Sequence, residues 1–177
     1  MKTSVPFRIT ALPVGHFAPL FPMSDTELAE HNARRYIADK KPGFPCRVSL
    51  VDAEPGEHVI LVPFSHHGAA SPYQASGPIF VREAARQAIL SAGEVPESVR
   101  GRLLSIRAYD AAGLMINAEV AEGGELEVYI DRFFADPRVA YLHLHNARPG
   151  CYSCRVERVV VEKANESNSS FACRHLS

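Results

Sequence analysis

The chain has 177 residues, of which 46% are hydrophobic and 22% are charged. This is the composition of a globular protein that is large enough to bury a core without disulfide support. The formal net charge of −1 argues against binding of nucleic acid or anionic membranes through bulk electrostatics. No apolar run reaches membrane-spanning length, and the N-terminal residues lack a secretory pattern. We therefore expect a cytoplasmic protein with reduced cysteines and with neither nucleic-acid nor membrane partners.

The first part of the chain predicts a strand and a long helix. Residues 7–12 have the pattern of a short strand. Ser24 and Glu27 have the capping-box spacing that begins a helix. Apolar residues then continue at helical spacing as far as Ile37, and the following Pro42 would stop the helix.

The middle of the chain predicts strands separated by a polar loop. Residues 46–51 and 58–64 have strand composition, and the short turn between them favours an antiparallel hairpin. Residues 65–77 are mostly small and polar, which is typical of a loop that carries function. Residues 77–83 predict another strand, and residues 82–90 predict a short helix.

The C-terminal half predicts hairpins around one amphipathic helix. A turn of helix is expected after Pro96, and residues 103–110 and 114–121 predict a second hairpin. Residues 123–137 predict a helix that ends at a proline. The remaining strands are predicted at residues 139–146 and 154–163.

These elements predict an α+β fold, with a mostly antiparallel sheet of seven or eight strands and two main helices. Regular βαβ alternation is missing, which argues against a doubly wound parallel sheet. We expect a single domain over residues 1–162. Residues 163–177 lose all periodicity and predict a flexible C-terminal tail.

The stretch HLHNARPGCYSCRVER concentrates the side chains that can carry chemistry. Residues two apart in a strand share a face, so His143 and His145 should project together. A turn at Gly150 would bring Cys151 and Cys154 back towards them. Imidazole and thiolate are the ligands that zinc prefers, although this spacing is not that of a common zinc finger or ribbon. A zinc site that uses only His143, His145 and Cys151 is the form that we retain.

Other roles remain open for these cysteines. Cys151 and Cys154 could form a redox pair, but a strand pattern follows them instead of the helix that usually activates such a pair. Alternatively, Cys46 or Cys151 could be a nucleophile, with a histidine as base and Asn146 as the orienting group. The histidines that could act as this base are His66, His143 and His145. A purely structural role is the remaining alternative, since cysteine is among the residue types most often buried.

A second group of candidates lies in the predicted loop. His66 follows an apolar strand, and Tyr73 lies a few residues further on. Together they could act as a general acid and base, or as a pair of ligand-binding groups. Two histidines on a solvated loop would give the same pattern, so this interpretation depends on where the side chains point.

Four arginines lie in or at the ends of apolar strand patterns, where a buried guanidinium needs a partner because an unpaired charge is very costly. They are Arg47, Arg82, Arg107 and Arg155. Internal ion pairs are the explanation that we favour for most of them, with partners among Asp52, Glu83, Asp110 and Glu157. The alternative is convergence on an anionic ligand, since guanidinium matches carboxylate and phosphate groups. No glycine-rich phosphate-binding motif is present.

Four ordered blocks give the chain a family resemblance. They are PGFPCRVSLVDAEPGE, SPYQASGPIFVRE, RLLSIRAYDAAGLM and HLHNARPGCYSCRVER. With them the chain resembles a bacterial family of small single-domain proteins described only as a domain of unknown function, over nearly all of residues 7–158. The resemblance implies a stand-alone cytoplasmic bacterial protein. It directs attention to Cys46, Arg47, His66, the loop of residues 71–73, Arg82, Arg107, residues 143–146 and Cys151, and less to Cys154.

Our leading hypothesis is one polar pocket that binds a small polar or anionic molecule, with zinc as a candidate cofactor. Its floor would be His143, His145 and Cys151, and its rim would be residues 66–76. The candidate catalytic residues for a hydrolysis or transfer reaction are Cys151, His145, His66 and Tyr73. The candidate ligand-binding residues are Arg47, Arg82, Arg107 and Asn146. The alternative is a non-catalytic binding or regulatory module in which these His, Cys and Arg residues are structural.

Overall fold

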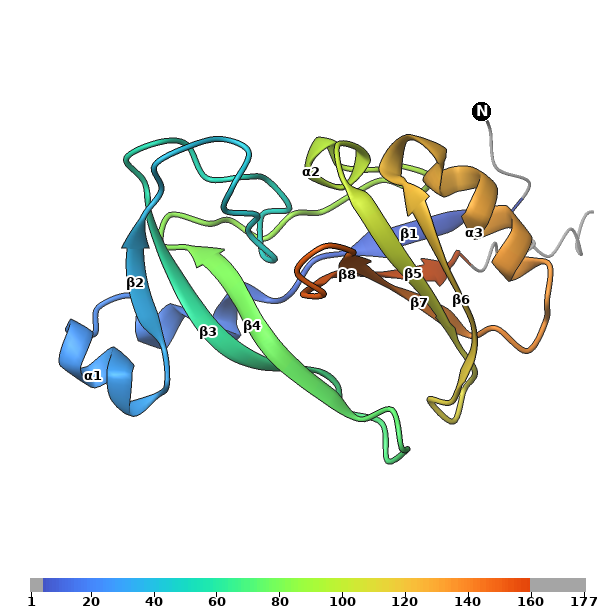
Figure 1. The fold of residues 1–177 in the computed structure, drawn as a ribbon, viewed down its shortest axis with the longest axis horizontal. Coiled ribbons are helices and arrows are strands. Elements are labelled where there is room, and N and C mark those ends of the chain that lie inside the picture. Colours follow the sequence, from blue (N-terminus) through green and yellow to red (C-terminus); the bar gives the residue numbers. More distant parts are fainter. Residues whose placement is uncertain (1–4, 160–177) are drawn as a thin grey trace, which may run out of the picture.

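The computed structural model describes residues 5–159, which form two antiparallel sheets side by side (Figure 1). The larger sheet has the strand order β1-β8-β7-β5-β6, and the smaller has the order β2-β3-β4. The elements are β1 (Phe7–Thr10), α1 (Asp25–Glu30), β2 (Arg34–Ile37), β3 (His58–His67), β4 (Ala75–Arg82), α2 (Glu97–Arg100), β5 (Leu103–Tyr109), β6 (Met115–Glu122), α3 (Leu126–Phe134), β7 (Tyr141–Asn146) and β8 (Tyr152–Arg158), with 3-10 turns at Val14–His16, Ala18–Leu20 and Gly123–Glu125. The predicted α+β class is therefore confirmed, with the strands divided between two sheets. The predicted tail of residues 163–177 lies outside the described residues.

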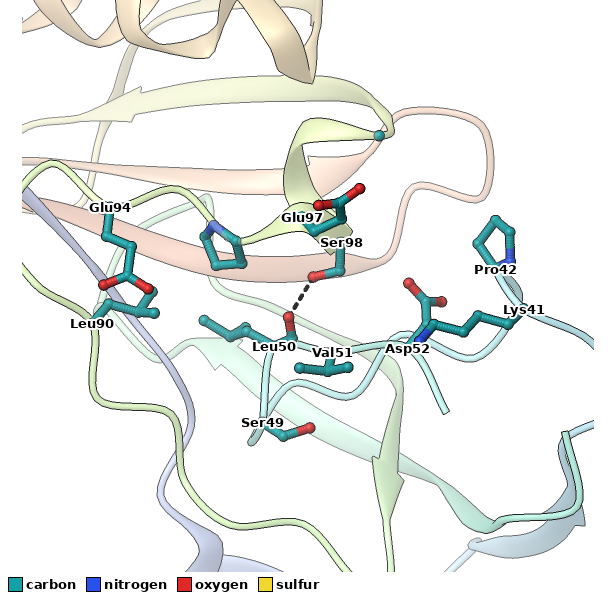
Figure 2. Close-up of a pocket in the computed structure, with 12 residues that line it drawn as sticks. Lys41, Pro42, Ser49, Leu50, Val51, Asp52, Leu90, Glu94, Glu97 and Ser98 are labelled. Atoms are coloured by element: carbon teal, nitrogen blue, oxygen red, sulfur yellow. Dashed lines mark hydrogen bonds between the residues drawn. The ribbon is translucent and has the colours of Figure 1, made fainter. Parts of the chain in front are cut away.

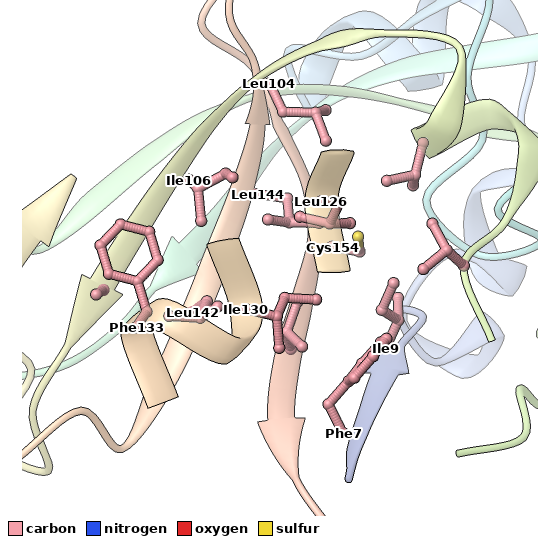
Figure 3. Close-up of a cluster of buried hydrophobic side chains, with 14 of the residues drawn as sticks. Phe7, Ile9, Leu104, Ile106, Leu126, Ile130, Phe133, Leu142, Leu144 and Cys154 are labelled. Carbon is pink, nitrogen blue, oxygen red and sulfur yellow. The ribbon is translucent and has the colours of Figure 1, made fainter. Parts of the chain in front are cut away.

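The larger sheet packs one face against α3 (Figure 3). Alternate residues of β5 and β7 point to that face, among them Leu104, Ile106 and Leu144, which are fully buried. Helix α3 presents Leu126 and Ile130 to them, because residues four apart lie on the same side of a helix. The opposite face of the same strands therefore receives their polar and aromatic residues.

The smaller sheet extends towards that polar face. Strand β3 is three residues longer than predicted, so His66 and His67 belong to the strand and not to the loop after it. A second core, which includes Val48, Ile60 and Val81, lies around this sheet and against Tyr152 of the larger one.

The predicted long helix is wrong beyond its first turns. The capping box is present as expected, because Ser24 and Glu27 hydrogen-bond each other's backbone. The helix nevertheless ends at Glu30. Asn32 then adopts the left-handed region with φ of 54°, and the Ala33 amide donates to the Leu28 carbonyl at 2.9 Å. Asparagine tolerates this helix-ending conformation, and the chain continues as β2.

The strand predicted at residues 46–51 is also wrong, and so is its hairpin with residues 58–64. The segment is a turn in which the Cys46 amide donates to the Val51 carbonyl at 3.1 Å and Leu50 has φ of +51°. Its alternating apolar residues are buried in different places, with Val48 in the second core and Leu50 in the first. Strand β3 pairs instead with β2 and β4.

The helix predicted at residues 82–90 is absent. After β4 the chain crosses from the smaller sheet to the larger one, with Ala85 in the second core and Ala88 against the first. The Ala88 amide donates to the Val48 carbonyl at 2.8 Å. The alanines that suggested a helix are small residues packed along this crossing. The helical turn after Pro96, the β5–β6 hairpin, α3 and β7 agree with their predictions.

None of the helices within residues 5–159 is long and apolar enough to cross a membrane.

The tips of the β3–β4 and β5–β6 hairpins contact each other (Figure 1). The Ser71 hydroxyl donates to the Gly113 carbonyl at 2.8 Å. A Cβ at Gly113 would lie 2.3 Å from the Ala69 Cβ, which is too close for two nonbonded carbon atoms. Glycine is therefore required at Gly113 both for its φ of +79° and for this close approach.

We expect Gly113→Ala to destabilise the protein more than Gly93→Ala. Both glycines have nearly the same positive φ, but a Cβ at Gly93 meets nothing within 4 Å. The strain of a left-handed alanine, about 1 kcal/mol, is common to both variants. Overpacking against Ala69 should cost Gly113→Ala roughly 1–3 kcal/mol more. Urea denaturation of the two variants measures this difference, and equal midpoints would contradict the contact between the hairpin tips.

Candidate functional site

The polar face of the larger sheet carries a cluster of aromatic and basic side chains, to which β3 contributes its last two residues. Strand pairing places His143 opposite both Arg107 and Arg155, so these three side chains share that face. The side chains of the cluster come from four strands: His66 and His67 (β3), Arg107 and Tyr109 (β5), Tyr141, His143 and His145 (β7), and Tyr152 and Arg155 (β8). We call the four histidines the histidine cluster.

Two β-bulges bring side chains into this cluster. Consecutive strand residues normally point to opposite faces, yet His66 and His67 both contact His143, with ring centres 6.3 and 5.3 Å away. The register of β3 shifts between Ser65 and His67, so His66 is the extra residue of a bulge. A second shift in β8 places Tyr152 opposite His145. Bulges often re-aim side chains next to functional sites.

Three imidazoles of the cluster lie at mutual contact distances. The ring centre of His66 lies 5.0 Å from that of His145 and 6.3 Å from that of His143, and the last two lie 6.3 Å apart. The His66 ring also stacks on Tyr152, with 14° between the planes. His143 and His145 are each 1% exposed, whereas His66 is only partly buried and lies nearer to solvent.

His67 has both ring nitrogens satisfied. Its Nδ1 lies 2.8 Å from the Tyr73 carbonyl and its Nε2 lies 2.8 Å from the Tyr141 hydroxyl. The carbonyl can only accept, so Nδ1 carries a proton, and in the neutral ring Nε2 then accepts from Tyr141. The predicted pairing of His66 with Tyr73 is thus replaced by one between His67 and the Tyr73 backbone.

The other three histidines each leave a buried nitrogen without a hydrogen-bond partner among the described residues. These atoms are His66 Nδ1, His143 Nδ1 and His145 Nε2. In His145 the Nδ1 proton is donated to the Gly150 carbonyl at 3.0 Å, so Nε2 carries the lone pair of the neutral ring. Buried polar atoms are rarely left unpaired, because each costs about 1–3 kcal/mol.

Burial keeps these imidazoles neutral near pH 7. It lowers the pKa of His143 from 6.5 to about 2, helped by the neighbouring His67 and Arg155. It also lowers the pKa of His145 to about 4, against the opposing hydrogen bond to Gly150. The pKa of His66 is lowered by burial and by Arg107.

Arg107 is a cation without an acidic partner within residues 5–159. Its Nε donates to the Ser105 hydroxyl at 3.3 Å. Burial raises the pKa of Tyr109, and the Arg107 guanidinium beside it acts in the opposite direction. Arg107 therefore faces His66, His145 and Tyr109 with its charge unbalanced.

Two other candidate arginines are neutralised by ion pairs, as the sequence led us to favour. Arg82 donates two hydrogen bonds to Glu57, at 2.9 and 2.5 Å. Glu57 is not one of the acidic partners that we expected. Arg155 pairs with the expected Glu157 at 2.7 Å and lies 3.8 Å from the centre of the Tyr141 ring. Both are therefore engaged within the protein.

The cysteines lie apart from the histidine nitrogens. Cys151 receives hydrogen bonds from Arg47 at 3.0 Å and Asn146 at 3.4 Å. Cys46 is buried and accepts from two backbone amides, at Ser49 and Arg82. Cys154 faces the α3 core, where burial raises its pKa to about 12. No described thiol therefore hydrogen-bonds to an imidazole, and Cys151 and Cys154 do not form a facing pair.

The predicted zinc ligands are not assembled in this structure. Within the part of the chain that is described, no group of three or more His, Cys, Asp and Glu side chains could hold a metal ion. A guanidinium 3.0 Å from the Cys151 sulfur would also repel a metal cation at that atom.

A separate pocket of about 440 Å³ lies where the turn of residues 49–52 meets α2 (Figure 2). Leu50, Val51 and Leu90 contribute apolar surface to it. The Ser98 hydroxyl donates to the Leu50 carbonyl at 2.6 Å across its wall. None of the four histidines of the histidine cluster lines this pocket, and the sequence patterns gave no sign of it.

The aromatic part of the site was not predicted from the sequence. No role was expected for His67 or for Tyr109, Tyr141 and Tyr152. A usable signal was present for Tyr141, because in YLHLHN it shares the alternation that aligned His143 with His145. Similarly, Tyr109 lies two residues after Arg107 on the same strand face.

The fold and the site define an α+β protein with two antiparallel sheets and a histidine cluster between them. Residues 43–158 match the family described as "Protein of unknown function (DUF1203)". Because this match covers more than half of the chain, the protein belongs to that family. The matched region contains every residue of the histidine cluster and its aromatic and basic neighbours. The comparisons with curated proteins and with solved structures gave no match.

We expect the protein to lose stability as the pH falls below 6.5. Above that value the imidazoles of His143 and His145 are neutral in both states. Below it the unfolded chain binds protons that the folded chain does not bind until about pH 4 for His145 and about pH 2 for His143. For His145 alone this difference corresponds to on the order of 3 kcal/mol.

Urea denaturation at a series of pH values measures this loss. His143→Gln, which cannot ionise, should flatten part of the slope, whereas replacement of the exposed His31 by Gln should leave it unchanged. A wild-type stability that is constant between pH 7 and pH 4 would contradict the neutral, buried state of these imidazoles.

Proposed function

We propose that the histidine cluster and Arg107 form a binding site for a small oxyanion that also carries an O–H group, such as hydrogen phosphate or a hydroxycarboxylate. One observation carries the proposal. A guanidinium without an acidic partner faces imidazoles whose buried nitrogens also lack partners. A charged and hydrogen-bonding ligand would satisfy both deficits.

The charges of the site favour an anion. Arg107 supplies a planar fork of N–H donors, which matches carboxylate and phosphate groups. It is only partly buried, as are Ser105 and His66, so a ligand can approach from solvent. The three imidazoles are neutral at pH 7 and do not compete with the ligand for Arg107.

The tautomer of His145 adds the requirement for an O–H group. Its Nδ1 proton is engaged by the Gly150 carbonyl, so Nε2 can only accept a hydrogen bond. The ligand must therefore donate to His145 while it accepts from Arg107. A hydrogen phosphate meets both requirements, whereas a sulfate dianion meets only the second.

Binding fits the site better than proton transfer. A general base works best when its pKa lies near the working pH, and a pKa of about 4 makes His145 a weak base at pH 7. The other residues that we considered for catalysis point the same way. Tyr73 contributes its backbone carbonyl, and the partners of Cys151 are Arg47 and Asn146, so no imidazole acts as a base for this thiol. We therefore propose a ligand-binding role and not a hydrolase or transferase.

Isothermal titration calorimetry with inorganic phosphate tests the site. We expect Arg107→Gln to weaken phosphate binding about tenfold or more, because a hydrogen bond to a charged group contributes about 1.5–3 kcal/mol. The matched control is Arg132→Gln, which removes an exposed arginine from α3. Sulfate should bind the wild-type protein more weakly than phosphate at pH 7, because it has no O–H to donate to His145.

Two results would contradict this proposal. One is phosphate affinity that is equal in the wild type and in Arg107→Gln. The other is a near-stoichiometric zinc content, measured by elemental mass spectrometry on protein purified without chelator, that His145→Ala abolishes. That result would favour the predicted metal site of His143, His145 and Cys151. A hydrogen bond from Nδ1, as in His145, is common in histidines that bind a metal through Nε2.

A further inference from the structure

Arg47 is a buried charge whose surroundings are unusual. It is 2% exposed, and no carboxylate within residues 5–159 pairs with it. Its backbone is fixed by bonds to Leu12 and Phe80 at 2.9 and 3.1 Å, so the side chain cannot leave the interior without breaking local structure. A guanidinium in this position requires acceptors on every side.

The acceptors of Arg47 are two carbonyls and one sulfur. Nε donates to the Tyr152 carbonyl at 2.7 Å, Nη1 donates to the Pro45 carbonyl, and Nη2 donates to Cys151 Sγ at 3.0 Å. The two carbonyl oxygens are unreactive. The Cys151 sulfur is therefore the nucleophilic atom among the three acceptors.

A second buried group also converges on this sulfur. Asn146 is 6% exposed and its amide donates to Cys151 Sγ at 3.4 Å. Its carbonyl oxygen Oδ1 has no partner among the described residues. The site around Cys151 therefore holds two donors and one unused acceptor, and Cys151 as a residue is partly exposed. A small molecule that both accepts and donates hydrogen bonds would complete it.

We propose that Cys151 is a reactive thiol that a hydroperoxide oxidises to a sulfenic acid. The sulfur forms a bond to one peroxide oxygen and the O–O bond breaks. The other oxygen leaves as hydroxide and takes up the thiol proton, which gives water when the oxidant is hydrogen peroxide. Sulfur loses two electrons and the peroxide gains them. Arg47 and Asn146 donate to the oxygen atoms on which negative charge develops, and Asn146 Oδ1 accepts from the peroxide O–H.

The surrounding fold keeps the oxidised sulfur from forming a disulfide with the other described cysteines. Cys154 lies on the opposite face of β8 within the α3 core, and Cys46 lies buried in the second core. Within residues 5–159 no cysteine is therefore placed to resolve the sulfenic acid, and a thiol from solution can reduce it. This inference rests on Cys151, Arg47 and Asn146, none of which belongs to the proposed anion site.

Sulfenic acid trapping tests this inference on the full-length protein. Native protein is treated with hydrogen peroxide in the presence of dimedone, and tandem mass spectrometry locates the adduct. We expect Cys151 to be labelled about tenfold or more faster than free cysteine in the same buffer, while Cys46 and Cys154 stay unlabelled. Asn146→Leu keeps the size of the side chain and removes the donor, and should slow the labelling about tenfold.

Controls separate this effect from unfolding. Cys151→Ser should abolish the fast adduct, and Arg132→Gln, which removes an exposed arginine from α3, should leave the labelling rate unchanged. Circular dichroism shows whether Arg47→Met folds. If it folds, its Cys151 should be labelled as slowly as in Asn146→Leu. If it does not fold, the labelling rate of Asn146→Leu alone tests the inference. Labelling of wild-type Cys151 no faster than free cysteine would overturn the inference, as would an Asn146→Leu rate equal to that of the wild type.

Discussion

The structure depends on one central strand that is buried on both faces. All six residues of β7 are buried, and the strand lies between β8 and β5 in the middle of the larger sheet. Leu142 and Leu144 point towards α3, so the alternation of the strand forces His143 and His145 to the other side. The same packing that builds the hydrophobic core therefore places two imidazoles in a buried position and makes their neutral form the stable one.

Local signals predicted much of this arrangement. The capping box at Ser24, the β5–β6 hairpin and the apolar stripe of α3 depend on residues close together in sequence, and each is present. The shared face of His143 and His145 also followed from alternation alone. The sequence therefore identified three of the four histidines of the cluster and the family, but it did not identify the atoms that the imidazoles contact.

The errors arose where distant packing overrides local pattern. The apolar alternation of residues 46–51 is real, but its residues are buried in two cores around a turn. A bulge in β3 made His67 as important as His66, and a bulge cannot be read from composition. Likewise, the contact between Arg47 and Cys151 joins residues 104 positions apart. No spacing rule links such residues, because the fold alone brings them together.

The turn of residues 46–52 has a consequence for how the molecule unfolds. Its apolar side chains are divided between the two cores, and Asp52 also pairs with Arg102 at 2.6 Å. Neither sheet can open without pulling this segment out of the other. The two sheets should therefore behave as one cooperative unit, with backbone amides in β3 and β7 exchanging with solvent at similar, slow rates. This turn, although it contains no helix or strand, would then be among the most protected parts of the chain.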